Sequence, residues 1–558
     1  MKSLKHITAI LLIAFTTLLM AGCKKSLELA PFNAFADQTA FSTPERCLLA
    51  LNGVYDAAQS GDYDPLNGTA HSVRGYPFGA ASIEQGDMRG EDMVNIATFY
   101  QITYQATYSP VSPNNVNMWI NLYLLINKAN LSIDGFKLAQ STGIITGPWE
   151  AQYEAECRFL RAMAHHELLI HFARPYLDGN GSQLGVPYHD YAIGSSAALV
   201  RVRSQPRDLV SVCYDKILAD LDYAEANLGA TVPSTLPGNI PPPTGANTFR
   251  ATKAAAIALK MRVKLHKGDW AGVIAEGNKL IPAAFPAPFP VLTANYWTGI
   301  VSPIGGWKLE ALPNGPFTNN QSTESVFSIK NDALDNTGVN AALAQMYGPN
   351  VPGRGLASIA PGIYNNPLWR CDDTRRSLLL IAGASNANTP SFFTKKYTDY
   401  VNQSDYAPMI RYAEVILMQA EAEARNAATI SQRAIDLLNL VRNRAIPSPA
   451  TNQYTAASFT DKNDLIAKIL YERRIEFLAE GKRWGDIHRL ALDPVFSPGG
   501  IPAKAVNGYS NAGGTYVCGN ASPAYAQLPI AYGDFRFLWP IPQDERVSNP
   551  IVAQNPGY

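Results

Sequence analysis

Apolar residues recur every three to four positions in several long stretches of the chain, a pattern typical of amphipathic helices. The clearest stretch runs from Leu465 to Leu490, where Ile469, Phe477 and Trp484 fall on one helical face. A glycine at position 481 interrupts it, and we expect the helix to bend or restart there. The same periodicity predicts a helix that starts at Pro44 and further helices over about 115–136, 148–173, 206–228, 251–267, 270–281, 409–426 and 431–444.

Two pairs of these helices are separated by only a few residues. Gly268-Asp269 joins the first pair, and the surrounding sequence looks like the turn of a tetratricopeptide repeat, with Trp270 wedged between antiparallel helices. The second pair spans 409–444. We therefore predict an all-α fold in which tetratricopeptide-like helical hairpins form the scaffold.

Three segments lack helical periodicity. Residues 60–113 are rich in Gly, Pro and aromatic residues, 229–250 form a proline-rich linker, and 282–405 form a long irregular insertion. They divide the chain into an N-terminal helical region, 42–228, and a C-terminal region, 251–558. Long loop insertions in a helical protein are usually functional, so we expect them to lie on one side of the scaffold and to carry the binding face.

Arg473 lies on the apolar stripe of the 465–490 segment. An unpaired buried guanidinium costs several kcal/mol, so it must have a carboxylate partner, and two glutamates lie within reach on its own face. Carboxylates beside arginines can also act as general acids or bases. A guanidinium within one turn holds each of these acids ionised, which favours a structural role. We predict a structural ion-pair network of Arg473, Glu476, Glu480, Arg483, Asp486 and Arg489.

The sequence ERRIEFLAEGKRWGDIHR, residues 472–489, resembles the signature near the C-terminus of the SusD/RagB lipoproteins, which capture nutrients for outer-membrane transporters in Bacteroidetes. The resemblance implies an all-α body with tetratricopeptide-like units. It also implies a partner, a SusC-like TonB-dependent β-barrel transporter, and a location on the exterior of the outer membrane. Further stretches that agree with the family are Tyr153–Phe172, Arg411–Asn426, Leu438–Ala445 and Leu538–Tyr558.

The N-terminus has the features of an export signal. Lys2 and Lys5 precede an apolar run over Ile7–Met20, which is too short for a membrane span. Small residues then precede Cys23 in a sequence that resembles a bacterial lipobox, although Met20 stands where Leu is more usual. We expect residues 1–22 to be removed, Cys23 to be acylated, and 23–41 to form a tether. An ordinary signal peptide with an incidental cysteine is the alternative.

Charge and cysteine content narrow the function classes. The 558 residues contain 46 Lys+Arg and 46 Asp+Glu, so no overall field attracts nucleic acid. Five cysteines follow the lipobox cysteine, and Cys47, Cys157 and Cys213 each occupy an apolar helical face. We predict no disulfide framework.

Catalytic signatures are incomplete. His166 and His171 are five residues apart rather than four, which rotates them about 140° from each other on a helix, so we expect core histidines rather than metal ligands. Residues 348–354 imitate a phosphate-binding loop, but Arg replaces the lysine and two prolines remove amide donors. We predict a protein that is not an enzyme and has no cofactor and no metal.

Aromatic residues on the long loops are the remaining candidates for function. Sugar rings stack their C–H faces on aromatic side chains, and polar groups bind their hydroxyls. We therefore predict an oligosaccharide-binding protein, with a peptide cargo, an adaptor that acts only through protein contacts and a surface glycoside hydrolase as alternatives. The aromatics can instead pin the loops to the scaffold. The candidate ligand contacts are Tyr296, Trp297, Trp307, Tyr76, Arg74 and Arg89.

The lipid anchor is directly testable. Protein purified from membranes should begin at residue 23 and carry the added mass of acyl chains, because the cleavage precedes Cys23 and frees its amine. Mass spectrometry of the mature N-terminal peptide measures both features. An unmodified terminus at any other residue would refute the anchor.

Overall fold

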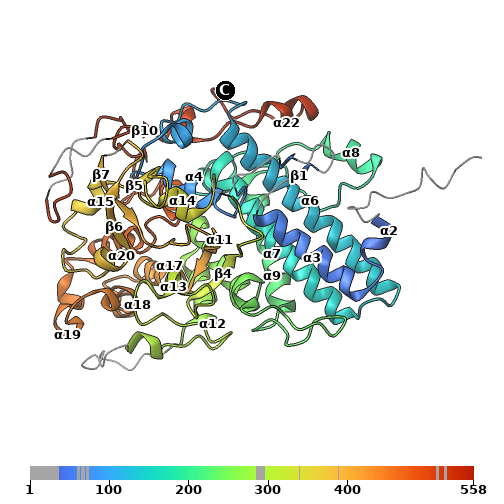
Figure 1. Ribbon diagram of the computed structural model, residues 1–558, viewed down its shortest axis with the longest axis horizontal. Helices are drawn as coiled ribbons and strands as arrows, with labels where there is room; N and C mark the ends of the chain where they lie inside the picture. Colours follow the sequence, from blue (N-terminus) through green and yellow to red (C-terminus); the bar gives the residue numbers. More distant parts are fainter. Residues whose placement is uncertain are drawn as a thin grey trace, which may run out of the picture.

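Long helices packed side by side form the body of the protein in the computed structural model (Figure 1). The structure describes residues 37–59, 63–64, 69–70, 75–283, 296–338, 340–387, 389–509, 514–520 and 525–558. The expected signal segment, Cys23 and most of the expected tether lie outside these residues. Among the helices that are described, none is both long and apolar enough to span a membrane.

The long helices stack in chain order. They are α3 (Pro44–Gln59), α6 (Pro113–Ser141), α7 (Gly147–Phe172), α9 (Val210–Asn227), α11 (Lys253–Lys267), α12 (Trp270–Leu280), α17 (Tyr412–Asn426), α18 (Gln432–Arg442), α20 (Lys462–Glu476) and α21 (Lys482–Arg489). α6 packs on α7, α7 on α9, α9 on α11, α11 on α12, and α12 on α17, which also contacts α18 and α20. Such a stack of neighbouring hairpins is the tetratricopeptide-like scaffold that the sequence predicts.

Shorter helices lie in the connections between the long ones. The short α-helices are α2 (Asp37–Ala40), α4 (Ala81–Arg89), α5 (Gln101–Tyr104), α8 (Ser196–Val202), α10 (Ala246–Phe249), α13 (Gly315–Thr318), α14 (Leu343–Tyr347), α15 (Pro361–Asn365), α16 (Arg375–Leu378), α19 (Pro449–Asn452) and α22 (Gln543–Ser548). The 3₁₀ helices are η1 (Thr98–Tyr100), η2 (Gly179–Gly181), η3 (Tyr296–Gly299), η4 (Asn443–Ala445), η5 (Ala456–Ser458) and η6 (Phe535–Phe537).

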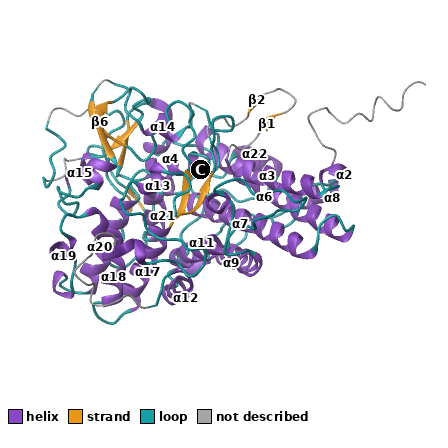
Figure 2. Cartoon of the chain, turned by 60° about the horizontal axis from the view of Figure 1, so that its bottom comes forward, coloured by secondary structure: helices purple, strands orange, loops and turns teal. Residues whose placement is uncertain are grey.

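Short antiparallel strand pairs lie at separate places in the helical body, with β6 at one end and β1 and β2 near the other (Figure 2). The pairs are β1 (Tyr63–Asp64) with β2 (Thr69–Ala70), β3 (Met93–Asn95) with β5 (Ala357–Ile359), β4 (Ser325–Ile329) with β8 (Ala407–Arg411), β6 (Leu380–Ala384) with β7 (Pro390–Thr394), and β9 (Gly500–Ile501) with β10 (Ile530–Ala531). Several of these strands lie inside the insertion that the sequence presents as irregular.

One predicted helix boundary and one predicted loop are wrong, because the segments concerned are buried on both faces. The helix expected from Met409 begins at Tyr412, because Ala407–Arg411 instead pairs with β4 as a fully buried strand. The expected loop over 60–113 contains the helix α4, whose buried residues include Glu84 and Arg89. Because polar and apolar side chains of α4 are both buried, the helix lacks the apolar stripe that identifies surface helices.

The expected break in the 465–490 segment is confirmed at Gly481, which separates α20 from α21. Gly481 has a φ of 73°, a left-handed conformation that favours glycine. Its backbone lies directly against α4, since a Cβ atom added to Gly86 would meet the Gly481 carbonyl oxygen at 2.2 Å. The Gly481 amide also donates a hydrogen bond to Asp87 Oδ1 at 3.0 Å. This turn therefore anchors α4 to the scaffold.

A buried charge cluster joins the end of α20 to elements distant in the sequence. Glu476 is 2% exposed. It accepts hydrogen bonds from Arg411 Nη1 at 2.9 Å, Arg444 Nη2 at 2.6 Å and Arg375 Nη1 at 3.0 Å. Four other buried acids pair with the same cations. The cluster consists of Glu324, Asp373, Glu472, Glu476, Glu480, Arg375, Arg411, Arg444 and Lys396.

The residues of the predicted ion-pair network all form ion pairs, but most of the pairs differ from those that the spacing predicts. Arg473 pairs with Asp486 at 3.1 Å rather than with a glutamate of its own helix. Arg483 pairs with Glu91 at 2.7 Å rather than with Glu480. The expected pair of Asp486 and Arg489 is present at 2.8 Å. Spacing along the segment identified the charged residues, whereas the turn at Gly481 and the approach of Glu91 decide which of them pair.

One disulfide bond is present, although we predicted no disulfide framework. Cys371 and Cys518 are bonded across 147 residues, which ties the C-terminal segment to the loop before α16. Cys47, Cys157 and Cys213 are free and buried, as expected. The pairing could not be read from the odd number of cysteines, because the two partners are far apart and have no framework spacing. Disulfides persist in oxidising compartments, which agrees with export.

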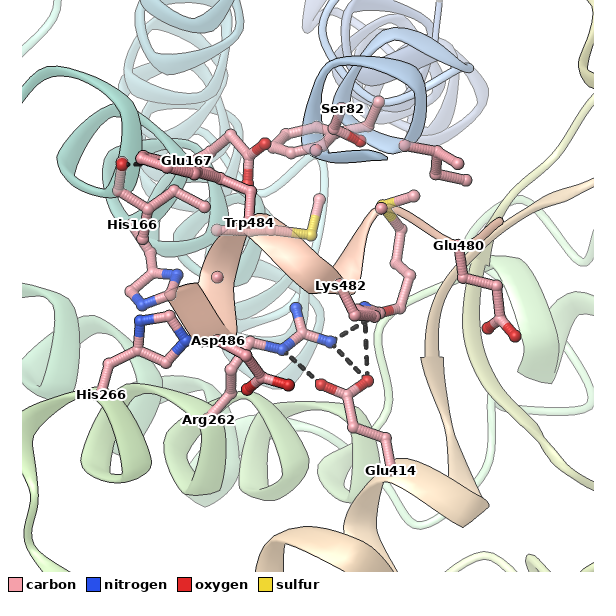
Figure 3. A pocket seen from close by; sticks show the side chains of 18 of the residues that line it. Ser82, His166, Glu167, Arg262, His266, Glu414, Glu480, Lys482, Trp484 and Asp486 are labelled. Carbon is pink, nitrogen blue, oxygen red and sulfur yellow. Dashed lines mark hydrogen bonds and ion pairs between the residues drawn. The ribbon is translucent and has the colours of Figure 1, made fainter. Parts of the chain in front are cut away.

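A cavity of about 70 Å³ lies where α4, α7, α11, β8 and α21 meet (Figure 3). Arg262 Nε donates to Glu414 Oε1 at 2.8 Å, and Lys482 Nζ lies 3.3 Å from the same carboxylate. His166 and His266 face each other edge to face, with ring centroids 4.8 Å apart. The charged groups that line this cavity all have partners within the protein, so we interpret it as a polar contact between core helices.

The expectation of core histidines is confirmed for both members of the near-miss motif. His166 packs on His266, whereas His171 stacks on Trp539 with ring centroids 4.4 Å apart. His171 is completely buried, and His166 is 4% exposed. The two rings thus have different surroundings. Among the described residues, no group of three or more His, Cys, Asp or Glu side chains is arranged to hold a metal ion.

The charge cluster predicts a large cost for removing its central acid. Glu476→Ala should lower the free energy of unfolding by about 3–5 kcal/mol, because it removes a buried negative charge that three buried arginines share. Urea denaturation measures the difference. Asp372→Ala is the matched control, since Asp372 forms an exposed pair with Arg370 and should change stability by no more than about 0.5 kcal/mol. A cost below about 1 kcal/mol for Glu476→Ala would contradict the central role of the cluster.

The buried histidines predict loss of stability in acid. Burial lowers the pKa of His166 and of His488 to about 3, from 6.5. The unfolded chain therefore takes up these protons first as the pH falls below 6.5. Each group should reduce the free energy of unfolding by about 1.4 kcal/mol per pH unit between pH 6 and pH 4. Denaturation of His166→Gln/His488→Gln at both pH values should show a shallower dependence, and an unchanged slope would refute this origin.

Candidate functional site

The aromatic candidates on the 296–310 loop are mostly buried. Trp297 is 7% exposed and its Nε1 donates to Ala311 O at 3.1 Å. Trp307 is 4% exposed, and Tyr296 is half-buried against the core. These positions favour the alternative that the aromatics pin a long loop to the scaffold, and they leave little aromatic surface for a ligand.

The second group of candidates is also in the core. Tyr76 is 1% exposed and accepts a hydrogen bond from Gln85 Nε2 at 3.1 Å. Arg89 lies over the Trp484 ring at 3.4 Å and donates to Phe537 O at 2.6 Å. Burial lowers the pKa of Arg89 to about 10. Both side chains serve packing in this structure, and Arg74 lies outside the described residues.

A surface cleft of about 220 Å³ lies instead between α3, the segment around α10, and the loop that follows β4. Three parts of the chain that are far apart in sequence form its walls. The side chains that line it are Asn52, Tyr55, Asp56, Gln59, Pro243, Phe249, Arg250, Ile329, Lys330 and Asp335. We refer to these residues as the surface cleft.

The first wall follows from the amphipathic pattern of α3. Leu51 and Val54 are buried, which turns Asn52 and Asp56, four residues apart, toward solvent. Tyr55 lies between them and is half-buried. One face of α3 therefore packs on α6, while its polar face borders the cleft.

Hydrogen bonds hold the aromatic wall in place. The Tyr55 hydroxyl donates to Glu156 Oε2 at 2.7 Å and accepts from the Ala251 amide at 2.9 Å. Arg250 donates to the same glutamate at 2.5 and 3.0 Å. Next to it, Phe249 packs edge to face on Tyr406, with ring centroids 6.2 Å apart. The two aromatic rings of the cleft are thus fixed before any ligand arrives.

The third wall is the loop 330–335, which is fastened to α3. Gln59 Nε2 donates to Lys330 O at 3.0 Å and to Asp335 O at 3.1 Å. Within the loop, Asp332 accepts from the amides of Leu334 and Asp335, each at 2.9 Å, and pairs with Lys330 at 2.9 Å. The loop therefore has a defined conformation, which places the Asp335 carboxylate at the cleft.

The cleft combines fixed aromatic rings with polar groups. Tyr55 and Phe249 offer apolar faces, while Asn52, Asp56 and Asp335 offer hydrogen-bonding groups. This is the combination that binds a polyhydroxylated ring.

Sequence reasoning missed the cleft residues, although some signals were present. The loop 330–335 belongs to the insertion predicted to carry the binding face, whereas Phe249 belongs to the predicted linker. The spacing of Asn52 and Asp56 marks a helix face, but a polar face is normal for any surface helix. No signal in the sequence showed that these three segments meet.

Comparison with known proteins agrees with this architecture. One family model, described as the SusD family, matches residues 379–558, and another, described as starch-binding and associating with the outer membrane, matches residues 78–265. The SusD-like protein P38 of Formosa agariphila is 24% identical over 534 residues, which cover 88% of this chain and 92% of that protein.

Solved structures share the fold along nearly the whole chain. A SusD superfamily protein from Bacteroides fragilis has a TM-score of 0.67 and 23% identity, covering 92% of this chain and 99% of its own. A SusD-like carbohydrate binding protein from Bacteroides vulgatus has a TM-score of 0.66 and 16% identity, covering 91% of this chain and 97% of its own. The two family models match segments in both halves of the chain, and the chain belongs to the SusD/RagB family.

Proposed function

We propose that this protein binds oligosaccharides in the surface cleft and delivers them to a SusC-like TonB-dependent β-barrel transporter. The proposal includes a lipid anchor at Cys23 that holds the protein on the exterior of the outer membrane. The observation that carries it is the cleft, in which fixed aromatic rings and hydrogen-bonding groups lie side by side. The family model described as starch-binding and the carbohydrate binding structure from Bacteroides vulgatus support the same ligand class.

The geometry suits capture of a flexible chain of sugars. Apolar sugar faces gain by leaving water against Tyr55 and Phe249, while hydroxyl groups replace their lost water contacts with hydrogen bonds to Asn52, Asp56 and Asp335. Because the walls are already held by internal hydrogen bonds, little ordering of the protein opposes binding. The cleft is also open, as the exposed side chains of Asn52 and Asp335 show, so a longer chain can extend beyond it.

The proposal assigns no bond-breaking step to the protein. Binding and release are sufficient for delivery to a transporter, and one matched family model and one similar structure are described by the carbohydrate that they bind. Purified protein incubated with a bound glycan should therefore release no new reducing ends.

A binding screen with one matched pair of variants tests the cleft. Calorimetry of the mature chain against a panel of oligosaccharides and peptides should identify a glycan ligand. Phe249→Ala should raise its Kd about tenfold, because a central aromatic contact is lost. Phe535→Ala is the control, since Phe535 is 41% exposed and lies outside the cleft, so its Kd should not change.

Three outcomes contradict the proposal. If no glycan in the panel binds, or if only peptides bind, the proposed ligand class is wrong. If a glycan binds with the same Kd to Phe249→Ala as to the unmodified protein, the proposed location is wrong.

A further inference from the structure

Two carboxylates in the cleft receive no hydrogen bond from the described residues. Among the described residues, neither the Asp56 nor the Asp335 side chain accepts a hydrogen bond or forms an ion pair. The two groups lie on opposite walls, one on α3 and the other at the end of the loop 330–335. An ionised carboxylate is an acceptor only, so both can bind a ligand that donates.

The cations around the cleft pair with other carboxylates or form no ion pair with Asp56 and Asp335. Lys330 pairs with Asp332 at 2.9 Å, and Arg250 pairs with Glu156 at 2.5 Å. Lys128 on α6 is the remaining cation that acts on Asp56, and the two form no ion pair within the described chain. Lys128 offsets part of the charge of Asp56, but no cation of the described chain forms an ion pair with Asp56 or Asp335, so the cleft retains negative charge.

The two carboxylates also influence each other. Partial burial raises the pKa of Asp56, the charge of Lys128 lowers it, and the charge of Asp335 raises it. The interaction agrees with their common position at the cleft. A third negative charge, brought in by a ligand, would be repelled by both of them.

A third unpaired acceptor lies on the wall between these two groups. Gln59 is 3% exposed, and its Nε2 donates to Lys330 O, Asn331 Oδ1 and Asp335 O. Its Oε1 has no hydrogen-bond partner among the described residues. This buried oxygen adds another acceptor, and no donor, to the wall behind the two carboxylates.

We infer that the cleft selects oligosaccharides without negative charge, whose hydroxyl groups donate to Asp56 and Asp335, and excludes those that carry uronate or sulfate groups. This inference rests on the proposed function and specifies its substrate class. Neutral hydroxyl groups satisfy the free acceptors, whereas an anionic group adds acceptors and repulsion where donors are needed.

Matched oligosaccharides in which a C6 hydroxymethyl group is either kept or oxidised to a carboxylate test the selectivity. The probes are cellotetraose and β-1,4-mannotetraose with their C6-oxidised uronate forms, together with the tightest neutral ligand from the panel and its C6-oxidised form. For any pair whose neutral member binds, the unmodified protein should have a Kd for that member at least tenfold lower than for its uronate form at 0.15 M salt. Asp56→Asn/Asp335→Asn should reduce this ratio to below threefold, because Asn keeps the side-chain size but removes the charge.

Two controls distinguish a local from a general charge effect. Asp215→Asn removes a carboxylate whose side chain is 70% exposed outside the cleft, and it should leave the ratio unchanged. Raising the salt to 0.5 M should improve binding of the uronate form to the unmodified protein, because added ions screen the repulsion. This salt arm tests the inference even if the double variant fails to fold.

Equal affinity for both members of a pair, or an unchanged ratio in the folded double variant, would overturn the inference while leaving glycan binding intact. Uronate binding that is insensitive to salt would overturn it as well. Failure of every neutral and charged glycan to bind would instead overturn the proposed function.

Discussion

The pairing of buried glutamates with buried arginines is the constraint on which the rest of the structure depends. Glu476 at the end of α20 pairs with Arg375, Arg411 and Arg444, which belong to three other elements. Burial alone would raise the pKa of Glu476, but the charges of these arginines outweigh it and hold the pKa below its ordinary value. A buried ion pair contributes little net stability compared with apolar packing, yet each partner strongly constrains where the others can be.

The same cluster connects the scaffold to the surface cleft. Glu324 immediately precedes β4 and pairs with Arg411 of β8 and with Arg444. The strand β4 ends at Ile329, and the loop 330–335 that follows it forms one wall of the cleft. Charges in the core therefore fix the strand from which the cleft loop extends. This link explains why a family signature made of charged residues lies far from the surface that we propose binds the ligand.

Much of the scaffold could be predicted from the sequence, because it rests on local signals. Apolar periodicity identified the long helices, and Gly481 marked the break between α20 and α21. The strand at 407–411 and the helix α4 were missed, since both are buried on all sides and have no amphipathic pattern. The disulfide between Cys371 and Cys518 was missed because sequence spacing carries no information about contacts across 147 residues.

The candidate site was harder to predict, for a different physical reason. Aromatic residues in irregular segments attract attention as ligand contacts, but Trp297 and Trp307 are buried because a long loop needs apolar anchors of its own. The cleft instead uses the polar face of α3, a ring from the proline-rich segment and a short acidic loop. Each of these features is ordinary by itself, and they acquire meaning only where the fold brings them together.

Hydrogen exchange in the presence of a bound glycan tests the central claim most directly. With the tightest neutral oligosaccharide at saturation, backbone amides should exchange more slowly at 52–59, 246–250 and 330–335, the three segments that form the cleft. The helices distant from the cleft should exchange at unchanged rates. Protection confined to 296–310, or to any surface that excludes these three segments, would show that the ligand binds elsewhere and would contradict this account.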